Sequence, residues 1–491
     1  MKNLKKLTLL HSNDMHGDFL EENADQKLVG GLSLLSGYVN KVRSDDENVI
    51  YAIAGDMFRG SVIDSEFRGI STIQIMNMLG PDIVTVGNHE VDYGVAHLLF
   101  LEKCADFPIV NANLHIKTNH ARLFDPYRII EIDGMKILFI GIITDVALMQ
   151  CKTDGLIGSF VTLEDAVEEI GRICNTYNAI DIDLTVLLTH IGFEEDKKLA
   201  AMLDPHWGVD VIIGGHSHTF LKEPAVINGI PIVQAGTGTD QIGRFDMLIN
   251  TDDNCIDSYA WQSIPIDSEH CPRDPAIEEL IFNYKNTTDE KYNRIITRFV
   301  RELTHPTRIR ETELGDLFSD VLKDALAVDI FLLGSGSIRT EKLGPVVTKG
   351  NLCECFPYDD AVHLVYMTGA QLRHAMLRML RDEALAGAHT EFYQLSEGLV
   401  VEYDQETHSL LRLEFEGEPV ADDRLFSVGL QHFHYMNLPD SFDLTIAELR
   451  RNRPDRIVST SCMQIIEEKL LAGQHQNATG EGRLILHLKN S

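Results

Sequence analysis

Prolines, tryptophans and long hydrophobic runs are scarce in this chain. It has 15 Pro and 2 Trp among 491 residues, and no stretch approaches the ~18 consecutive apolar residues that a membrane-spanning helix needs. Hydrophobic residues make up 44% of the chain and charged residues 24%, as in an ordinary folded protein. The composition excludes wholesale disorder, a collagen-like fibre and a coiled-coil rod. At ~150 residues per domain, the length indicates two large domains or about three smaller ones.

Positive charge is scarce as well. Lys and Arg number 43 against 75 Asp and Glu, which gives a formal net charge of -32. Such a surface serves solubility and repels polyanions, so we expect neither a long nucleic acid nor a membrane as a partner. A small anionic substrate would need a local cationic site made by metal ions or a few arginines.

The cysteines and the N-terminus carry no export signal. The cysteines stand singly except for Cys353 and Cys355, and two thiols alone make an incomplete metal site, so we expect reduced cysteines. The first apolar run spans only Leu7–Leu10, too short for the core of a signal peptide. We therefore predict a cytoplasmic protein. The sequence carries no signal for its oligomeric state.

The first half of the chain alternates short apolar runs with helical patterns. Between the first two runs, Leu32, Leu35, Val39 and Val42 recur at helical spacing. Continuous apolar runs of this length indicate strands that are buried on both faces, and their alternation with helices predicts an α/β layered domain. The predicted strands are Leu7–Leu10, Val49–Ala54, Ile83–Val86, Ile109–Val110, Ile137–Ile143, Leu184–Leu188 and Val209–Ile213.

The second half follows a different pattern. A helical pattern from Ala276 to about Val300 indicates a connecting helix, and a mixed α+β domain follows from Thr304. We predict a first domain over residues 1–270, a linker over 271–303 and a second domain over 304–491. The elements expected in the second domain are helices at Leu314–Leu326 and Thr368–Arg381 and strands at Ile330–Leu333, Leu399–Tyr403 and Leu410–Phe415, with His432, Phe433 and His434 read as strand residues.

Residues of metal-ligand type follow five of the predicted strands. In an open parallel sheet the carboxyl ends of the strands lie along one edge, where ligands bind, so distant residues can converge there. A lone histidine or Gly-Asp turn after a strand is usually structural, but five such signals at one topological position are not expected by chance. The candidates are Asp14, His16, Asp56, Asn88, His190, His216 and His218.

These residue types indicate the class of metal. Imidazole with carboxylate suits Zn or Mn, with Fe, Co or Ni as alternatives, and does not suit an all-oxygen Ca site. Seven ligands are too many for one tetrahedral ion but divide between two ions if Asp56 bridges them. Two ions ~3.5–4 Å apart can bind a bridging hydroxide and clamp a phosphoryl group for in-line attack. His89 adjoins a ligand yet is surplus to the seven.

The motifs resemble a known family. HSNDMHG, AGDMF, GNHEVDYG, LLTHIG and GGHSH resemble the calcineurin-like metallophosphoesterases, and their finer spelling is similar to the 5'-nucleotidase family within them. That family includes bacterial UDP-sugar hydrolases and 2',3'-cyclic-nucleotide phosphodiesterases. The resemblance implies a four-layer αββα catalytic domain over residues 1–270, joined by a helix to a C-terminal α+β substrate-recognition domain over 304–491.

The resemblance also implies roles for individual residues. One metal would take Asp14, His16, Asp56 and His218, and the other Asp56, Asn88, His190 and His216. His89 and Asp92 match the catalytic dyad of the family. His89 would stabilise charge on the transferring phosphoryl group or protonate the leaving alkoxide, and Asp92 would hold its imidazole cationic and oriented.

In the second half the resemblance implies a nucleotide site. Arg339, in the Gly-Ser turn GSGSIR, would contact the substrate phosphate, and Tyr358 and Phe442 would sandwich the base. Asp440 stands in the stretch that matches the GGDGF turn of the family, and Gly334 stands where the family usually has Asn. The alternatives are that both aromatics belong to the core and that Arg339 pairs with a surface carboxylate.

The sequence thus predicts a two-metal phosphohydrolase that acts on small nucleotides, with metal-bound hydroxide attacking phosphorus in line. The alternatives within enzymes are a 2',3'-cyclic-nucleotide phosphodiesterase and a UDP-sugar pyrophosphatase. A nucleotide-binding scaffold without catalysis is the non-enzymatic alternative. As in relatives, rotation of the domains about the connecting helix would carry substrate to the metals.

Overall fold

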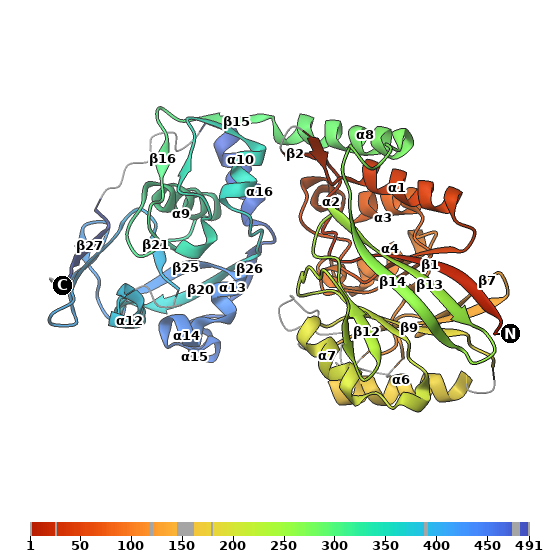
Figure 1. The fold of residues 1–491 in the computed structure, drawn as a ribbon. Coiled ribbons are helices and arrows are strands. Elements are labelled where there is room, and N and C mark those ends of the chain that lie inside the picture. The colour runs from red at the N-terminus through yellow and green to blue at the C-terminus, as the bar shows by residue number, and fades with distance from the viewer. Residues whose placement is uncertain are drawn as a thin grey trace. The chain divides into compact units, whose positions relative to one another are not determined.

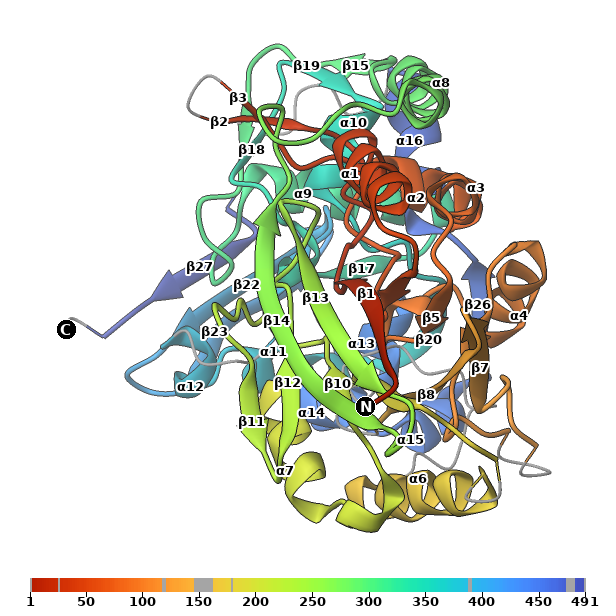
Figure 2. The same cartoon turned by 45° about the vertical axis from the view of Figure 1, so that its right-hand side comes forward.

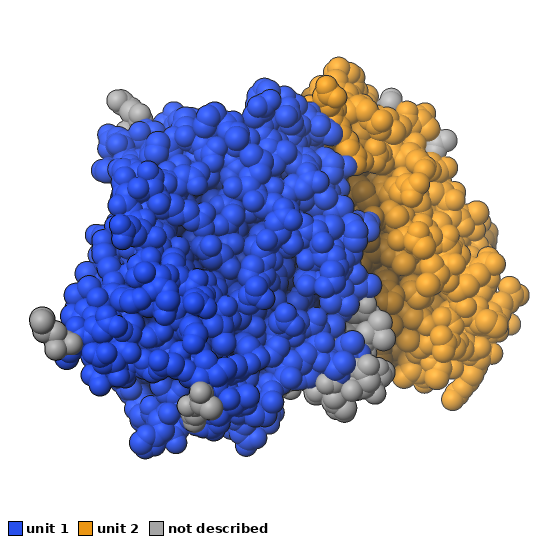
Figure 3. Space-filling view, turned by 90° about the vertical axis from the view of Figure 1, so that its right-hand side faces the viewer, with its two compact units in different colours: residues 1–288 blue, residues 289–491 orange. Residues whose placement is uncertain are grey.

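The computed structural model describes residues 2–24, 27–116, 121–144, 162–177, 180–386, 391–473 and 482–489. The chain divides into two compact units, residues 1–288 and 289–491, which Figure 3 colours separately. Within the described ranges, no helix has both the length and the apolar character to cross a membrane.

Unit 1 is built on two six-stranded sheets. The first, in spatial order, consists of β14 (Cys255–Pro265), β13 (Gln241–Asn250), β1 (Leu4–Ser12), β4 (Val49–Ile53), β5 (Ile83–Thr85) and β6 (Ile109–Val110). The second consists of β11 (Ala225–Ile227), β12 (Ile230–Val233), β10 (Val211–Ile213), β9 (Leu184–His190), β8 (Met135–Ile143) and β7 (Tyr127–Ile132). The long strands β13 and β14 extend the first sheet beside β1 (Figure 2).

Helices cover the outer faces of both sheets. They are α1 (Leu32–Asp45), α2 (Val62–Phe67), α3 (Ile70–Leu79), α4 (Val95–Cys104), α6 (Leu163–Tyr177) and α7 (Phe193–Met202), with 3-10 turns at His89–Val91 and Pro205–Trp207. A small hairpin joins β2 (Glu22–Ala24) to β3 (Lys27–Val29). The helix α8 (Pro275–Tyr292) contains the boundary between the two units.

The layers of unit 1 follow from the alternation of side chains along the strands. Successive side chains point to opposite faces of a sheet. In β1, Leu9 lies in the core between the two sheets with Phe139 of β8, whereas Leu10 lies in the core under α1 and α3. On the far side, Ile140 of β8 packs with Ile170 of α6. The order is helix, sheet, sheet, helix, as Figure 1 shows, and the predicted αββα layers are confirmed.

The strand ends expected along one sheet edge come instead from two sheets. β1, β4, β5 and β6 are parallel in the first sheet, and β8, β9 and β10 are parallel in the second. The interpretation of a single parallel sheet is therefore wrong. Strands buried on both faces show the same apolar runs whether they belong to one sheet or to two, so the pattern does not separate these cases.

Unit 2 has a five-stranded sheet of β21 (Tyr393–Leu395), β17 (Ile330–Gly334), β25 (Leu425–Gln431), β20 (Val362–Thr368) and β26 (Arg456–Ser459). A four-stranded sheet holds β24 (Glu418–Pro419), β23 (Ser409–Phe415), β22 (Leu399–Asp404) and β27 (Leu484–His487). The short pairs are β15 (Ile295–Arg298) with β19 (Val346–Thr348) and β16 (Leu303–Thr304) with β18 (Lys342–Leu343).

The helices of unit 2 are α9 (Glu313–Leu326), α10 (Lys349–Cys355), α11 (Gly369–Met379), α12 (Asp382–Leu385), α13 (His432–Met436), α14 (Leu438–Phe442), α15 (Ile446–Asn452) and α16 (Cys462–Leu471), with a 3-10 turn at Ser335–Ser337. The helices and strands predicted from sequence in this unit match α9, α11, β17, β22 and β23.

Two predicted elements differ from the structure. The helix expected to run to about Val300 ends at Tyr292, and the following Ile295–Arg298 pairs with β19, as its β-branched residues favour. His432–His434, expected in a strand, begin the helix α13. The last residue of β25 that pairs is Gln431, opposite Val362 where β20 begins, so beyond it the chain has no strand to pair with there.

Candidate metal centre

The seven candidate ligands lie at the carboxyl ends of five strands. Asp14 and His16 follow β1, Asp56 follows β4 and Asn88 follows β5, all in the first sheet. His190 is the last residue of β9, and His216 and His218 follow β10, in the second sheet. The two sheets pack with these ends together, and the structure brings all seven side chains into one neighbourhood.

The first group of ligand atoms surrounds Asp14. Its Oδ1 lies 3.5 Å from His218 Nε2 and 4.0 Å from His16 Nε2, and the two imidazole nitrogens are 3.0 Å apart. His16 Nε2 is also 3.9 Å from Asp56 Oδ2. Asp14, His16 and His218 thus offer ligand atoms within 4.8 Å of one another.

The second group of ligand atoms extends from Asp56. Asp56 Oδ2 lies 3.1 Å from His190 Nε2, which lies 3.2 Å from Asn88 Oδ1. Asn88 Oδ1 is in turn 2.7 Å from His216 Nδ1. Asp56 therefore has carboxylate oxygen within reach of both groups, the position that a bridging ligand needs.

The electrostatics of the site fit bound cations. Asp14 and Asp56 are buried, and among the described residues only histidines pair with them. Burial acts to lower the pKa of His190, but the carboxylates of Asp56 and Asp14 outweigh it and raise that pKa to about 10. The two buried carboxylates therefore favour positive charge beside them, and imidazole, carboxylate and amide oxygen are donors that divalent transition metals accept.

The backbone at the ligands is held in a conformation that is rare for these residues. The left-handed region costs about 1–3 kcal/mol for a residue other than glycine and persists only where the surroundings fix it, which is common at functional sites. Five of the seven candidates adopt it: Asp14 at φ 50°, His16 at 49°, Asp56 at 56°, His216 at 79° and His218 at 52°.

Glycines beside the ligands allow their close approach. A Cβ on Gly215 would lie 2.8 Å from His190 Nδ1, and one on Gly87 would overlap the Asp56 carboxylate. Hydrogen bonds then orient the imidazoles and carboxylates. His190 Nδ1 donates to the Ala54 carbonyl at 2.8 Å, and the backbone N–H of His216 donates to Asp14 Oδ2 at 2.9 Å.

Glu90 is a supporting residue that the sequence reasoning gave no role. It is buried, and its carboxylate accepts the backbone N–H groups of Gly87 at 2.6 Å, Met57 at 2.7 Å and Asp56 at 3.0 Å. Burial and the neighbouring Asp56 raise the pKa of Glu90 to about 7. Glu90 ties the loop after β5 to the loop after β4. The position of Glu90 next to His89 in the GNHE motif was the sequence feature that could have indicated this role.

His89 and Asp92 form the expected pair. His89 Nδ1 lies 2.8 Å from Asp92 Oδ2, and this hydrogen bond is the main cause that raises the pKa of His89. Burial acts to raise the pKa of Asp92, but hydrogen bonds from His89 and Arg59 hold it below its usual range. The rings of His89 and His16 are 5.2 Å apart. An imidazole that is protonated more readily than a free one therefore stands beside the candidate ligands.

In unit 2 the structure brings Arg339 and Tyr358 together. The guanidinium carbon of Arg339 lies 5.8 Å from the centroid of the Tyr358 ring, and both side chains are exposed, Tyr358 at 40%. Within the described ranges Arg339 forms no ion pair, so the alternative of a surface salt bridge finds no support there. This turn follows β17, where the Gly-Ser turn was predicted.

Phe442 does not fit the stacking role predicted for it. It is 0% exposed and packs against Tyr393 with ring centroids 4.5 Å apart, so it offers no face to a base. The core alternative is therefore the correct one for Phe442. Asp440 lies exposed on α14. These two predicted residues thus have very different surroundings.

Phe433, interpreted from the sequence as a strand residue with no ligand role, is an exposed aromatic. It is 51% exposed on α13. The backbone N–H of His432 donates to the Ala361 carbonyl at 2.8 Å, which ties α13 to the segment after Tyr358. Ser337 donates to Gln431 Oε1 at 2.9 Å, which ties it to the Gly-Ser turn. Nothing in the sequence indicates that Phe433 is exposed and Phe442 is buried.

A second arginine adjoins the Gly-Ser turn. Arg308 Nη1 lies 4.0 Å from where a Cβ on Gly336 would stand, and Glu391 Oε2 lies 3.4 Å from that point. Burial raises the pKa of Glu391, although Arg308 and Arg339 both oppose the shift. Two guanidinium groups therefore surround this turn, where the sequence reasoning found one.

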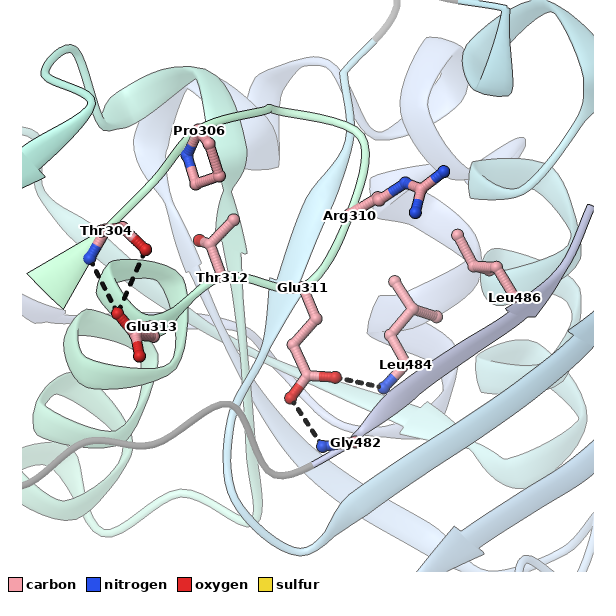
Figure 4. A pocket seen from close by; sticks show the side chains of 9 residues that line it. All are labelled: Thr304, Pro306, Arg310, Glu311, Thr312, Glu313, Gly482, Leu484 and Leu486. Carbon is pink, nitrogen blue, oxygen red and sulfur yellow. Dashed lines mark hydrogen bonds between the residues drawn. The ribbon is translucent and has the colours of Figure 1, made fainter.

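A cavity of about 540 Å³ elsewhere in unit 2 contains none of the predicted residues (Figure 4). Glu311 accepts the backbone N–H groups of Gly482 at 3.0 Å and Leu484 at 2.9 Å, and Glu313 accepts that of Thr304 at 3.0 Å. Both carboxylates in its wall are thus engaged in holding backbone, which indicates a structural role.

Both halves of the chain are similar to known proteins. The calcineurin-like phosphoesterase family matches residues 7–220, which include every candidate ligand and the His89–Asp92 pair, and the 5'-nucleotidase C-terminal domain family matches residues 287–444. The 5'-nucleotidase of Mus musculus is 26% identical over 91% of this chain and 85% of its own. The trifunctional nucleotide phosphoesterase protein YfkN of Bacillus subtilis is 26% identical over 75% of this chain and 27% of its own. The crystal structure of a 5'-nucleotidase precursor from Thermus thermophilus shares the fold, with a TM-score of 0.61 and 24% identity over 99% of this chain and 100% of its own.

Proposed function

Because the chain belongs to the 5'-nucleotidase family of calcineurin-like phosphoesterases and is a phosphoric ester hydrolase, we propose that it hydrolyses nucleotides at a site that holds two divalent metal ions. The observation that carries the proposal is the place of Asp56, whose carboxylate is within 3.1 Å of His190 and 3.9 Å of His16, one imidazole from each ligand group. When bound, two such ions would act as Lewis acids on the phosphoryl oxygens and supply a nucleophilic water at neutral pH.

The ligands would divide between the two ions around Asp56. One ion would take Asp14, His16 and His218, and the other Asn88, His190 and His216. The donor set of imidazole, carboxylate and amide oxygen suits Zn or Mn, with Fe, Co or Ni as alternatives.

His89 would act on the leaving group. Its Nδ1 is engaged by Asp92, so Nε2 is the nitrogen that can meet substrate. Because the hydrogen bond to Asp92 raises the pKa of His89, this imidazole binds a proton more readily than a free one does. It would offset charge on the phosphoryl group or donate that proton to the departing oxygen.

Unit 2 would recognise the nucleotide. Arg339 and Arg308 offer guanidinium groups for phosphate, which they can contact in bidentate fashion. Tyr358 and Phe433 offer exposed rings for the base, and stacking is worth ~1–3 kcal/mol per base. Phe433 takes the place that the sequence reasoning assigned to Phe442.

Two alternative substrate classes within enzymes accompany this proposal. A 2',3'-cyclic nucleotide and a sugar nucleotide both present a phosphoryl group to the same centre, and the relative YfkN is described as a trifunctional nucleotide phosphoesterase. Membership of a hydrolase family removes the alternative of a scaffold without catalysis.

A substrate panel tests the proposal. The chain, reconstituted separately with Mn²⁺ and Zn²⁺, is assayed on AMP, 2',3'-cyclic AMP, UDP-glucose and single-stranded DNA. We expect turnover of at least one nucleotide that a chelator abolishes, no turnover of DNA, and loss of both metal and activity in Asp56→Asn. Absence of turnover on every substrate with a fully loaded site would overturn the proposal.

A further inference from the structure

We propose that Arg59 determines substrate specificity by binding a second phosphate group on the leaving side of the scissile bond, beside His89. The inference rests on the proposed function, because it names a substrate class for the same site. Arg59 stands three positions after Asp56, in the loop between β4 and α2.

Arg59 and His89 both contact the same oxygen of Asp92. Its Nε donates to Asp92 Oδ2 at 2.9 Å, and His89 Nδ1 contacts the same oxygen at 2.8 Å. The guanidinium therefore lies next to the imidazole that would serve the leaving group. Its side chain is 44% exposed, so it is also open to a ligand.

The arginine is fixed in this place by its surroundings. Its backbone N–H donates to Asp64 Oδ2 at 2.9 Å, and the hydroxyl of Tyr93 donates to the same oxygen at 2.6 Å. The guanidinium carbon lies 5.0 Å from the centroid of the Tyr93 ring. Asp64 is fully buried, so a rigid anchor holds both the loop and the ring. An arginine that is already ordered loses little freedom on binding a ligand.

The neighbours of Arg59 pack on a candidate metal ligand. The carbonyl of Phe58 lies 3.4 Å from His16 Nδ1, and a Cβ on Gly60 would overlap the carbonyl of His16. Arg59 stands between these two contacts, with φ at 67°. The loop therefore places its guanidinium at the rim of the metal centre.

The guanidinium retains donors that the protein does not use. Among the described residues, only its Nε has an acceptor, and the two terminal amino groups have none. The planar fork of a guanidinium matches two oxygens of a phosphate. In a chain of net charge -32, a fixed and partly unused cation at the reaction centre is suited to an anionic part of the substrate.

A phosphate leaving group would interact with the Arg59 guanidinium during the reaction. Water adds across a P–O–P bridge: its oxygen bonds to one phosphorus, the bridging bond to that phosphorus breaks, and the other phosphate leaves with the electron pair. Arg59 would offset the charge that develops on that leaving phosphate. An alcohol or phenol leaving group carries no such phosphate and gains nothing from Arg59.

The test compares two substrates on the metal-loaded full chain. UDP-glucose carries a second phosphate and p-nitrophenyl phosphate does not, and kcat/KM is measured for both. Arg59→Met should lower the ratio of UDP-glucose to p-nitrophenyl phosphate by about 10-fold or more, as loss of a charge-assisted contact predicts. Arg59→Gln, which retains a donor for Asp92, should lower the same ratio. Arg128→Gln removes an equal charge from an exposed position on β7 and should leave it unchanged.

Three results would overturn the inference. One is a ratio that stays constant in both Arg59 variants, even if both rates fall together, because Arg59 would then act only through Asp92. The second is a wild-type protein that cleaves p-nitrophenyl phosphate but not UDP-glucose. The third, no cleavage of any phosphate ester by the loaded wild type, would remove the proposed function itself and is thereby distinguished from the other two.

Discussion

Glu90 accepts the backbone N–H of Asp56 at 3.0 Å, so a carboxylate outside the candidate ligand set holds the residue that faces both ligand groups. It accepts the N–H of Met57 and of Gly87 as well. Three donors on one buried carboxylate fix two loops from different strands. The geometry of the metal centre therefore depends on this residue.

Replacing Glu90 should weaken metal binding. Glu90→Gln leaves one acceptor oxygen where two served three N–H groups, so the loop that carries Asp56 loses part of its support. We expect metal affinity to fall by about 10- to 100-fold, as for other residues that orient ligands. Calorimetric titration with Mn²⁺ measures it. Glu131→Gln, at an exposed position on β7, is the matched control, and equal affinities in the two variants would contradict this role.

His89→Ala should separate catalysis from metal binding. The imidazole of His89 is hydrogen-bonded to Asp92, and the contact of His89 with Asp56 Oδ1, at 2.8 Å, is made by its backbone N–H, which alanine keeps. Removal of the imidazole should therefore leave metal content near normal and lower kcat by about 10²-fold or more. Elemental analysis and steady-state kinetics on the same preparation check both parts. Survival of full activity would show that the dyad assignment is wrong.

The two phenylalanines of unit 2 should respond in opposite ways. Phe442 is buried against Tyr393, so Phe442→Ala should lower the free energy of unfolding by about 3–5 kcal/mol. Phe433 is exposed, so Phe433→Ala should leave stability nearly unchanged.

Kinetics complete that comparison. Phe433→Ala and Tyr358→Ala should raise KM for nucleotides and spare p-nitrophenyl phosphate, which has no base to stack. An equal loss on both substrates would rule out a stacking role for these rings.

The stability of unit 2 should depend on the protonation of Asp316. Burial raises the pKa of this fully buried carboxyl to about 8, although Arg483 acts in the opposite direction. The folded state then binds a proton that the unfolded state has released, so the contribution of Asp316 to stability is greatest below about pH 4 and falls as pH rises towards 8.

Asp316→Asn should remove that dependence. Relative to wild type, the variant should gain at least about 1 kcal/mol of stability between pH 4 and pH 8. Urea unfolding at a series of pH values measures the difference. A constant offset between the two proteins across this range would show that Asp316 does not titrate as its burial implies.

The sequence allowed the convergence of the candidate ligands to be predicted because each of them directly follows an apolar strand. Asp14, Asp56 and His190 lie far apart in the chain, yet strand topology alone implies that they meet. The pattern did not separate one sheet from two, because strands such as β4 and β9 are apolar on both faces in either case.

Other features lay beyond the sequence for different physical reasons. Phe433 and Phe442 are the same residue type in neighbouring short helices, and only packing decides which is buried. Glu90, Arg59 and Arg308 are charged residues in turns or loops, where no periodicity applies. Their partners are backbone amides or side chains of other loops, which only the folded chain brings near.

The left-handed backbone at Asp14, His16, Asp56, His216 and His218 bears on how this centre could change. Turns of this kind accept glycine, asparagine or aspartate but reject β-branched residues. Replacing Asp14 by the uncharged asparagine keeps the turn and alters only the donor atom. Valine at the same position would deform the loop even when no ion is bound. Only a few substitutions at these five positions can therefore change which metal the site prefers. The backbone conformation of the folded chain, rather than the ion, limits which substitutions these are.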